Sequence, residues 1–276
     1  MKVEATALGK KHPRYAATLM SFAAVLQATG RYEMAEAVLR EAQNILSTTV
    51  GKRNSTYTAC LGRVADLHRA MRNYKLARAL YVQVRDAQGR WPRGRRSLEH
   101  AGTLCSLAAV DEALGLHDEA DSLLRQAEWI RFCRLGRQHA DYAAGLNNQA
   151  SFHKNRGNHT EAKRLYLEAR DIWARTVGEG HPDFATCLNN LAGLHTAMGE
   201  HEEAEAMYLQ AKAAWAKLVG EQHPNYATVL NNLAGLYKAM GVYEKAFALY
   251  QQASQIRRET IGVEHPDYDS AVTGME

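Results

Sequence analysis

Apolar residues recur along the chain in two alternating patterns, and each pattern returns about every 42 residues. In the first pattern, a leucine is followed by an alanine four residues later. Residues four apart lie on one face of an α-helix, and a small residue there lets a neighbouring helix approach closely. The six pairs are Leu19–Ala23, Leu61–Ala65, Leu104–Ala108, Leu146–Ala150, Leu188–Ala192 and Leu230–Ala234.

The second pattern begins with another alanine, twelve residues after the first. Leucine or tyrosine follows four residues on, and a small apolar residue follows three residues further. This spacing is typical of the buried face of a second helix. The alanines that open the second pattern are Ala35, Ala77, Ala120, Ala162, Ala204 and Ala246.

Glycine and proline mark the ends of these helices. A glycine lies between the two patterns in five copies, and Arg72 takes its place in the second copy. A further glycine follows most second helices, and several next helices open on His-Pro, where a missing N–H costs no helical hydrogen bond. The sequence therefore predicts antiparallel helix pairs. The glycines between patterns are Gly30, Gly115, Gly157, Gly199 and Gly241.

The repeats define the expected domain organisation. We expect one all-α array over residues 1–276, built as a solenoid of about six repeats, with one extra residue in the loop containing Arg93 to Arg96. The repeats lie at approximately 12–53, 54–96, 97–138, 139–180, 181–222 and 223–264, followed by a partial seventh first helix at 265–276.

The two ends of this array lack obvious polar capping segments. Val3, Ala7 and Leu8 look like the remnant of a second helix, and 265–276 begins a first helix. Unpaired apolar faces at solenoid ends predict a homo-oligomer formed through the open ends, or contact with another domain of a larger signalling protein.

The small–large–small spacing resembles the tetratricopeptide repeat. The 42-residue period, the Leu-Asn-Asn segment of three copies and the His-Pro boundary resemble the variety found in kinesin light chains and many bacterial signalling proteins. The resemblance implies a right-handed superhelix and a scaffold that binds a protein or peptide partner in a concave groove. It implies neither catalysis nor a cofactor.

The first helices of copies four to six carry the candidate peptide-binding residues. Paired asparagines follow the leucine there, and an amide side chain can pair with both the C=O and the N–H of an extended peptide. Lysines beside them favour an acidic segment. In related repeats such asparagines hold peptide backbone, which implies this role for the first asparagine of each pair. The candidates are Asn147, Asn148, Ser151, Lys154, Asn155, Asn189, Asn190, Thr196, Asn231, Asn232 and Lys238.

A second role is open for the same asparagines. They can tie one repeat to the next through side-chain hydrogen bonds. The first three copies lack paired asparagines, with Met20–Ser21, Gly62–Arg63 and Cys105–Ser106 at these positions. Either role therefore belongs to the second half of the chain.

Histidine is frequent, but its positions argue against a metal site. Eleven of the twelve histidines fall at positions that recur from copy to copy. Residues one period apart lie a whole repeat apart, which is too far to share one ion. No phosphate-loop, dinucleotide or hydrolase motif is present, so we predict no enzyme activity.

Charge is divided unevenly along the chain. Residues 1–138 hold 22 Lys and Arg against 13 Asp and Glu, a net +9, and residues 139–276 have a net −5. Arg90, Arg93, Arg95 and Arg96 surround Trp91 and Pro92, a combination that could contact nucleic acid. We favour a solvated loop with Trp91 packed against its own helix, and no nucleic-acid partner, because no recognition motif accompanies it.

The remaining composition indicates a soluble protein. No apolar run reaches the eighteen or so residues of a membrane span, and the N-terminus lacks the apolar stretch of a signal peptide. The four cysteines form no Cys-x-x-Cys pair, which favours unpaired thiols. We therefore expect a cytoplasmic location and no membrane partner.

Overall fold

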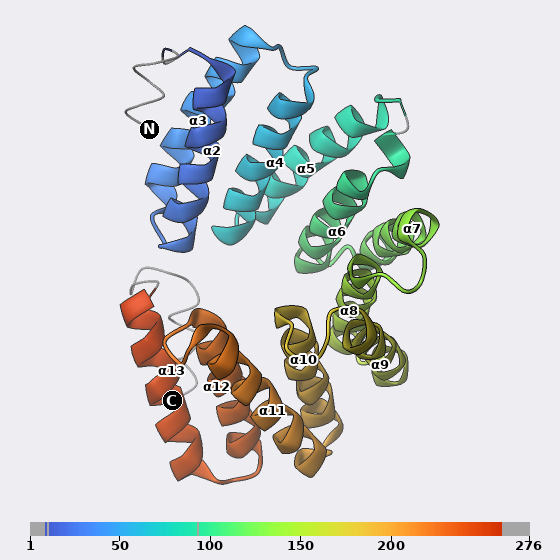
Figure 1. Ribbon diagram of the computed structural model, residues 1–276, viewed down its shortest axis with the longest axis vertical. Helices are drawn as coiled ribbons and strands as arrows, with labels where there is room; N and C mark the ends of the chain where they lie inside the picture. Colours follow the sequence, from blue (N-terminus) through green and yellow to red (C-terminus); the bar gives the residue numbers. More distant parts are fainter. Residues whose placement is uncertain (1–8, 10, 93, 261–276) are drawn as a thin grey trace. The chain divides into compact units, whose positions relative to one another are not determined.

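The structure is a computed structural model that describes residues 9, 11–92 and 94–260 (Figure 1). This part of the chain contains twelve α-helices, one short 3-10 helix and no β-strand. The seventh first helix and the segment of Val3, Ala7 and Leu8 lie outside it. The elements are α2 (Pro13–Ala28), α3 (Tyr32–Thr49), α4 (Ser55–Ala70), α5 (Tyr74–Gly89), η1 (Gly94–Arg96), α6 (Leu98–Ala113), α7 (His117–Leu135), α8 (Ala140–Asn155), α9 (His159–Thr176), α10 (Pro182–Met198), α11 (His201–Val219), α12 (Pro224–Ala239) and α13 (Tyr243–Thr260).

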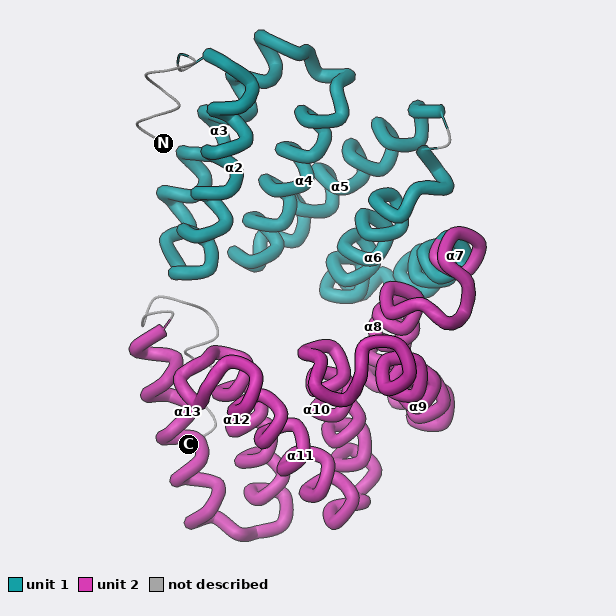
Figure 2. Tube along the Cα trace, in the orientation of Figure 1, with its two compact units in different colours: residues 1–130 teal, residues 131–276 magenta. Residues whose placement is uncertain are grey.

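The chain forms two compact units, residues 1–130 and 131–276, with the boundary inside α7 (Figure 2). In unit 1, α2 packs on α3 and α4 on α5; in unit 2, α8 packs on α9, α10 on α11 and α12 on α13. Each pair also contacts the next pair within its unit. The predicted all-α class and helix pairing are confirmed. The single continuous array and its right-handed superhelix stay predictions.

The core of each unit consists of the two recurring apolar patterns. The alanines of both patterns are buried in all six copies, between 0% and 3% exposed. Tyr81, Tyr166, Tyr208 and Tyr250 of the second pattern are buried as well. Small residues at the helix contacts and large ones beside them give the interlocking packing on which helix pairs depend.

Histidines begin four of the first helices as N-caps. His12, His139, His181 and His223 each accept a hydrogen bond at Nδ1 from the backbone N–H two residues later, at 3.1 to 3.2 Å. This bond satisfies one of the N–H groups that a helix start leaves without an internal partner. The predicted helix-start positions are confirmed for these four, and His265 lies outside the described residues.

Left-handed backbone ends the first helices, as predicted from the glycines. Gly199, for example, is the C-cap residue of α10 and has φ 78°. Arg72 takes the same conformation with φ 57° and is the one non-glycine residue with positive φ in the described chain. A left-handed arginine costs about 1 kcal/mol relative to glycine, so the second copy tolerates a strained turn.

Ala192→Leu tests the close helix contact. Ala192 has no exposed surface, so extra methyl groups must push α10 away from its neighbours. We expect a loss of about 1 to 3 kcal/mol in the free energy of unfolding, measured by urea denaturation. Ala206→Leu, on the exposed side of α11, is the control and should change stability by less than about 0.5 kcal/mol. Equal stability of the two variants would contradict this packing.

Candidate peptide-binding surface

The candidate residues all lie on the first helices of unit 2. These helices, α8, α10 and α12, are neighbours, because α10 contacts both of the others. Asn147, Asn148, Ser151, Lys154 and Asn155 are on α8. The remaining candidates are Asn189, Asn190 and Thr196 on α10, and Asn231, Asn232 and Lys238 on α12.

Hydrogen bonds between asparagines cross from each first helix to the next. Asn190 Nδ2 donates to Asn147 Oδ1 at 3.2 Å, and Asn232 Nδ2 donates to Asn189 Oδ1 at 3.1 Å. Asn147 and Asn189 are only 9% and 8% exposed. A buried amide oxygen is costly without a donor, so these bonds stabilise the register of adjacent repeats. The structure thus gives the asparagines the inter-repeat role that the sequence left open.

The paired asparagines of the three first helices, called the amide row here, retain hydrogen-bonding capacity toward a ligand. They are Asn147, Asn148, Asn189, Asn190, Asn231 and Asn232. Each bond uses one hydrogen of one amide and one lone pair of the other, whereas an amide side chain offers two donors and an acceptor. Asn190 and Asn232 are half-buried and Asn148 is exposed, so these second asparagines lie nearer to solvent than Asn147 and Asn189. Peptide contact through the row is compatible with the bonds and stays a prediction.

Tyrosine hydroxyls of the second helices reach the first helices at one recurring position. Ser151 and Tyr166 share a hydrogen bond of 2.8 Å, and in unit 1 Tyr81 donates to Asp66 at 2.5 Å. Glycine takes the position of Ser151 in the last two copies, as Gly193 and Gly235.

Gly193 leaves room where three elements meet. A Cβ added to it would lie 3.3 Å from Tyr208 Oη and 3.7 Å from Lys154 Nζ. Burial raises the pKa of Tyr208, so its hydroxyl keeps its proton at neutral pH. Lys154 on α8, Gly193 on α10 and Tyr208 on α11 therefore place an ammonium and a hydroxyl at one point beside the amide row. We did not predict Gly193 or Tyr208 from the sequence, although the change from serine to glycine was visible there.

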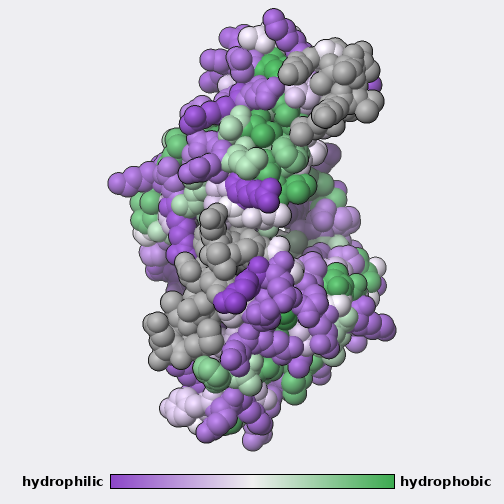
Figure 3. All heavy atoms as spheres, turned by 90° about the vertical axis from the view of Figure 1, so that its left-hand side faces the viewer, coloured by the Kyte–Doolittle hydropathy of each residue, from purple (hydrophilic) through white to green (hydrophobic). Residues whose placement is uncertain are grey.

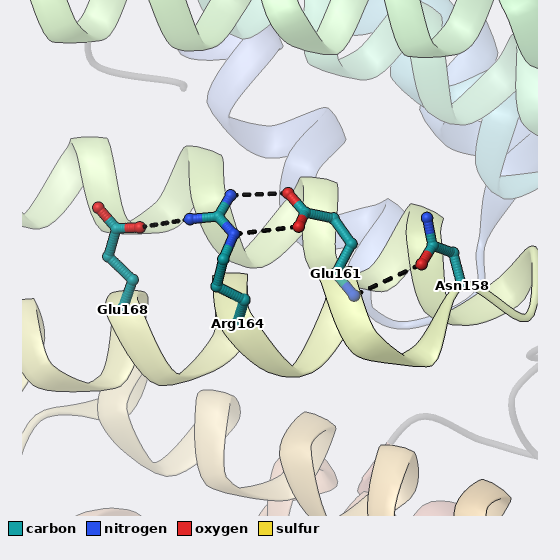
Figure 4. A network of polar contacts seen from close by, with 4 residues as sticks. All are labelled: Asn158, Glu161, Arg164 and Glu168. Carbon is teal, nitrogen blue, oxygen red and sulfur yellow. Dashed lines mark hydrogen bonds and ion pairs between the residues drawn. The ribbon is translucent and has the colours of Figure 1, made fainter.

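Charges on the second helix α9 are satisfied locally (Figure 4). Arg164 binds Glu161 at 2.7 Å and Glu168 at 3.1 Å, and Asn158 Oδ1 accepts from the Glu161 N–H at 3.4 Å. The guanidinium of Arg164 is the main cause that holds the pKa of Glu161 below its usual value. These exposed groups form an intrahelical network in which one guanidinium bridges two carboxylates.

Thiols and histidines show no catalytic or metal-binding arrangement in the described chain. Burial raises the pKa of Cys60 to about 11 and of Cys187 to about 12, so both remain neutral thiols. None of the four cysteines, all of which lie in the described ranges, forms a disulfide bond. Across the described ranges, no three His, Cys, Asp or Glu side chains lie close enough to hold a metal ion. Nor does any described helix have the length and apolar character to cross a lipid bilayer.

Family models of the tetratricopeptide repeat match residues 16–53, 141–217 and 183–259. Together the matches cover more than half of the sequence. The chain therefore belongs to the tetratricopeptide repeat family, as the spacing of its alanines and aromatic residues indicated. No curated protein matches its sequence.

Two solved structures with TM-scores above 0.6 share the fold at low sequence identity, and a third has a lower score. BtubC (BKLC) from P. vanneervenii is 21% identical with a TM-score of 0.61, over 88% of this chain and 91% of that one. A Rap protein complexed with competence and sporulation factor is 15% identical with a TM-score of 0.64, over 95% and 70%. A Podosopora anserina putative kinesin light chain with nearly identical TPR-like repeats is 22% identical with a TM-score of 0.48, over 90% and 97%.

Asn189→Ala tests the inter-repeat bond. The substitution removes the acceptor of the Asn232 amide in a mostly buried place, so we expect a loss of about 0.5 to 1.5 kcal/mol in the free energy of unfolding. Thermal melting should show a decrease of a few degrees. Asn148→Ala, at an exposed asparagine of the same sequence pattern, is the control and should melt like the unchanged protein. Identical melting of both variants would show that the bond contributes no stability.

Proposed function

We propose that unit 2 binds an extended acidic peptide segment of another protein across α8, α10 and α12. The family assignment makes the chain a protein-interaction scaffold, and the peptide surface is the finer step. The observation that supports it most is the amide row: hydrogen bonds between repeats hold the asparagines in fixed positions, one repeat apart, on adjacent first helices.

Fixed amides favour binding because less side-chain freedom is lost when a peptide arrives. Immobilising a flexible side chain at an interface costs about 0.5 to 1.5 kcal/mol, and the inter-repeat bonds have already restricted these groups. A peptide backbone that follows the row presents alternating C=O and N–H groups, and amides can pair with both. The row therefore recognises an extended conformation more than a particular sequence.

The acidic preference rests on the position of the lysines. Lys154 lies beside Gly193 and Tyr208, and Lys238 occupies an exposed position on α12. Unit 2 carries more acidic than basic residues overall, so its general field repels an acidic segment. Attraction would then be confined to the lysine side of the amide row, which fixes where the peptide lies.

The solved neighbours support a partner-binding role in general terms. A Rap protein that shares the fold was solved in complex with competence and sporulation factor. We extend partner binding to this chain as a proposal, together with a non-catalytic role and a cytoplasmic location.

Binding to an array of acidic peptides tests the proposed surface. For the best peptide, Asn148→Ala should weaken binding about fivefold by removing about 1 kcal/mol of hydrogen bonding without affecting folding. Lys238→Ala should weaken binding mainly at low salt and slow association, because exposed charges are screened. Lys217→Ala, which removes the same charge from α11, is the control. Unchanged affinity in both test variants, or equal losses in all three, would contradict the surface.

Association of two copies through α12 and α13 is the second candidate function. Asn231 Oδ1 is buried and has no hydrogen-bond partner among the described residues, although the corresponding oxygens of Asn147 and Asn189 accept from the next repeat. Phe247 is 51% exposed. In the two preceding copies, Lys163 and Glu205 occupy the position of Phe247. Lys163 binds Glu200 of the following repeat, and Glu205 accepts a hydrogen bond from Tyr237 of the repeat after its own.

Large apolar side chains are exposed on α13. Figure 3 shows green, apolar residues among purple, polar ones in both units. Tyr243 and Phe247 on α13 are among the exposed large apolar side chains. A second copy could present both an apolar helix face and a donor for Asn231, which is what this surface requires.

The mass of the protein in solution tests this association. We expect a concentration-dependent increase above the 30.7 kDa monomer at high micromolar concentration, measured by sedimentation equilibrium. Phe247→Glu should abolish the increase by placing a charge in the contact. Leu209→Glu, at an exposed leucine of α11, should leave it unchanged. A monomeric mass at all concentrations would remove this candidate.

A further inference from the structure

The boundary between α5 and α6 departs from the repeat pattern. It holds one extra residue, and α5 ends at Gly89, two residues before the position at which α3 and α9 end. His100, near the start of α6, is the one histidine in the sequence outside the recurring positions. These differences are confined to one boundary of unit 1, which is separate from the proposed peptide surface in unit 2.

The connection between the two helices is tightly built. Trp91 N–H donates to the Gln88 carbonyl at 3.1 Å, Gly94 N–H to the Trp91 carbonyl at 2.9 Å, and Ser97 N–H to the Gly94 carbonyl at 3.0 Å. A Cβ on Gly94 would lie 1.9 Å from the Gln88 carbonyl oxygen, so only glycine allows this close approach. The loop is thereby fixed against the end of α5.

A cavity of about 500 Å³ opens beside this loop, and arginines dominate its lining. Arg85, Arg90 and Arg95 line it together with a single carboxylate, Asp86, to which Arg85 is bonded at 2.9 Å. Three guanidinium groups and one carboxylate leave a net charge of +2. Like charges gathered around a hollow repel one another, so an anion placed among them is strongly favoured.

His100 is a buried histidine in the lining of this cavity. Its side chain is 93% buried (7% exposed), and its Nδ1 lies 3.2 Å from Gln88 Oε1, to which it donates. Burial lowers the pKa of His100, and the nearby Arg85 and Arg95 lower it further. The imidazole is therefore neutral at pH 7, and the positive charge of the cavity comes from the arginines.

A second cavity of about 500 Å³ shares one lining residue, Arg90, with the first. Its other lining residues include Lys52, Arg53 and Trp91. Trp91, just after the end of α5, thus lines a cavity together with Ala87 of that helix. The sequence interpretation expected Trp91 to pack against the helix in a solvated loop. An indole beside a cationic cavity can accept the planar ring of a ligand by stacking.

We propose that these two cavities bind a nucleoside monophosphate, with its phosphate among Arg85, Arg90 and Arg95 and its base beside Trp91. A phosphate monoester carries −1.5 to −2 at pH 7 and so balances the net +2 of the first cavity, whereas a single carboxylate balances only half of it; Lys52 and Arg53 add positive charge at the second cavity. Guanidinium forks bind phosphate oxygens in pairs. The basic groups converge on two hollows of ligand size, which fits a small molecule better than a nucleic-acid strand.

Titration with AMP, followed by calorimetry at 150 mM salt, tests the site. We expect saturable binding at one site per chain, and no binding of adenosine, which lacks the phosphate. Arg90→Gln combined with Arg95→Gln should weaken AMP binding at least tenfold. Both arginines are exposed, so this variant should fold, which circular dichroism verifies. Arg31→Gln combined with Arg40→Gln, at exposed arginines of α2 to α3 in the same unit, is the charge-matched control and should bind within twofold of the unchanged protein.

Trp91→Ala tests the contribution of the base separately from that of the phosphate. It should weaken AMP binding severalfold and leave binding of inorganic phosphate unchanged, because phosphate contacts only the arginines. Equal losses in the cavity variant and the control would reduce the effect to net charge and overturn the proposal. So would tight binding of single-stranded oligonucleotides with a steep salt dependence and no binding of AMP, which would assign the arginines to nucleic acid instead.

Discussion

Close approach of helices at paired alanines is the constraint on which both units depend. Ala192 and Ala204 have no exposed surface, and neither do most of their counterparts. With only a methyl group at the contact, neighbouring helices come near enough for a tyrosine of the second helix to reach across the first. The hydroxyl of Tyr166 meets Ser151 in this way, and that of Tyr208 lies beside Gly193. Small residues at the contact therefore also determine which polar groups arrive at the surface of the first helices.

Ion pairs join adjacent repeats in both units, and unit 2 adds hydrogen bonds between amides. In unit 1, Arg78 on α5 binds Asp111 on α6 at 2.6 Å, and Asp111 is 1% exposed. A buried carboxylate depends on its cation, because removing the partner leaves an uncompensated charge. In unit 2, Lys163 occupies the position of Arg78 and binds Glu200 of the following repeat at 3.2 Å, and neutral amides add direct bonds between first helices. Amides carry a smaller desolvation cost than charges, and they keep donors and acceptors for a ligand.

Local features of this fold could be predicted from the sequence, because they depend on residues within one helix or turn. The His-Pro starts, the left-handed turn at Arg72 and the buried alanines belong to this group. Contacts between repeats could be predicted only as alternatives. Whether Asn190 reaches Asn147 or solvent depends on how α8 and α10 are positioned relative to each other. The length of the sequence repeat does not give that position.

The arrangement of the α5–α6 boundary was still harder to predict from the sequence. One inserted residue breaks the period, so no other copy indicates how Arg90, Arg95 and Trp91 are arranged. The sequence interpretation treated them as a solvated loop, and the cavities depend on the close packing of Gly94 against Gln88. Irregular loops of this kind need three-dimensional information because their side chains are positioned by non-repeating backbone contacts.

Both proposed sites would attract anions, yet their chemistry separates the ligands. Unit 1 offers three guanidinium groups in one cavity with a single carboxylate, an arrangement that suits the concentrated charge and several oxygens of a phosphate. Unit 2 offers single lysines beside a row of neutral amides, which suits a polypeptide whose carboxylates are spread along a hydrogen-bonding backbone. A peptide in the cavity of unit 1 would meet three guanidinium groups that can donate to its carbonyls but fewer side-chain acceptors, Asp86 and Gln126, for its N–H groups. A lone phosphate at Lys154 would meet one ammonium and a tyrosine hydroxyl, too few donors for a dianion. Under the two proposals, the uneven charge along the chain would correspond to two kinds of recognition and not to one extended basic surface.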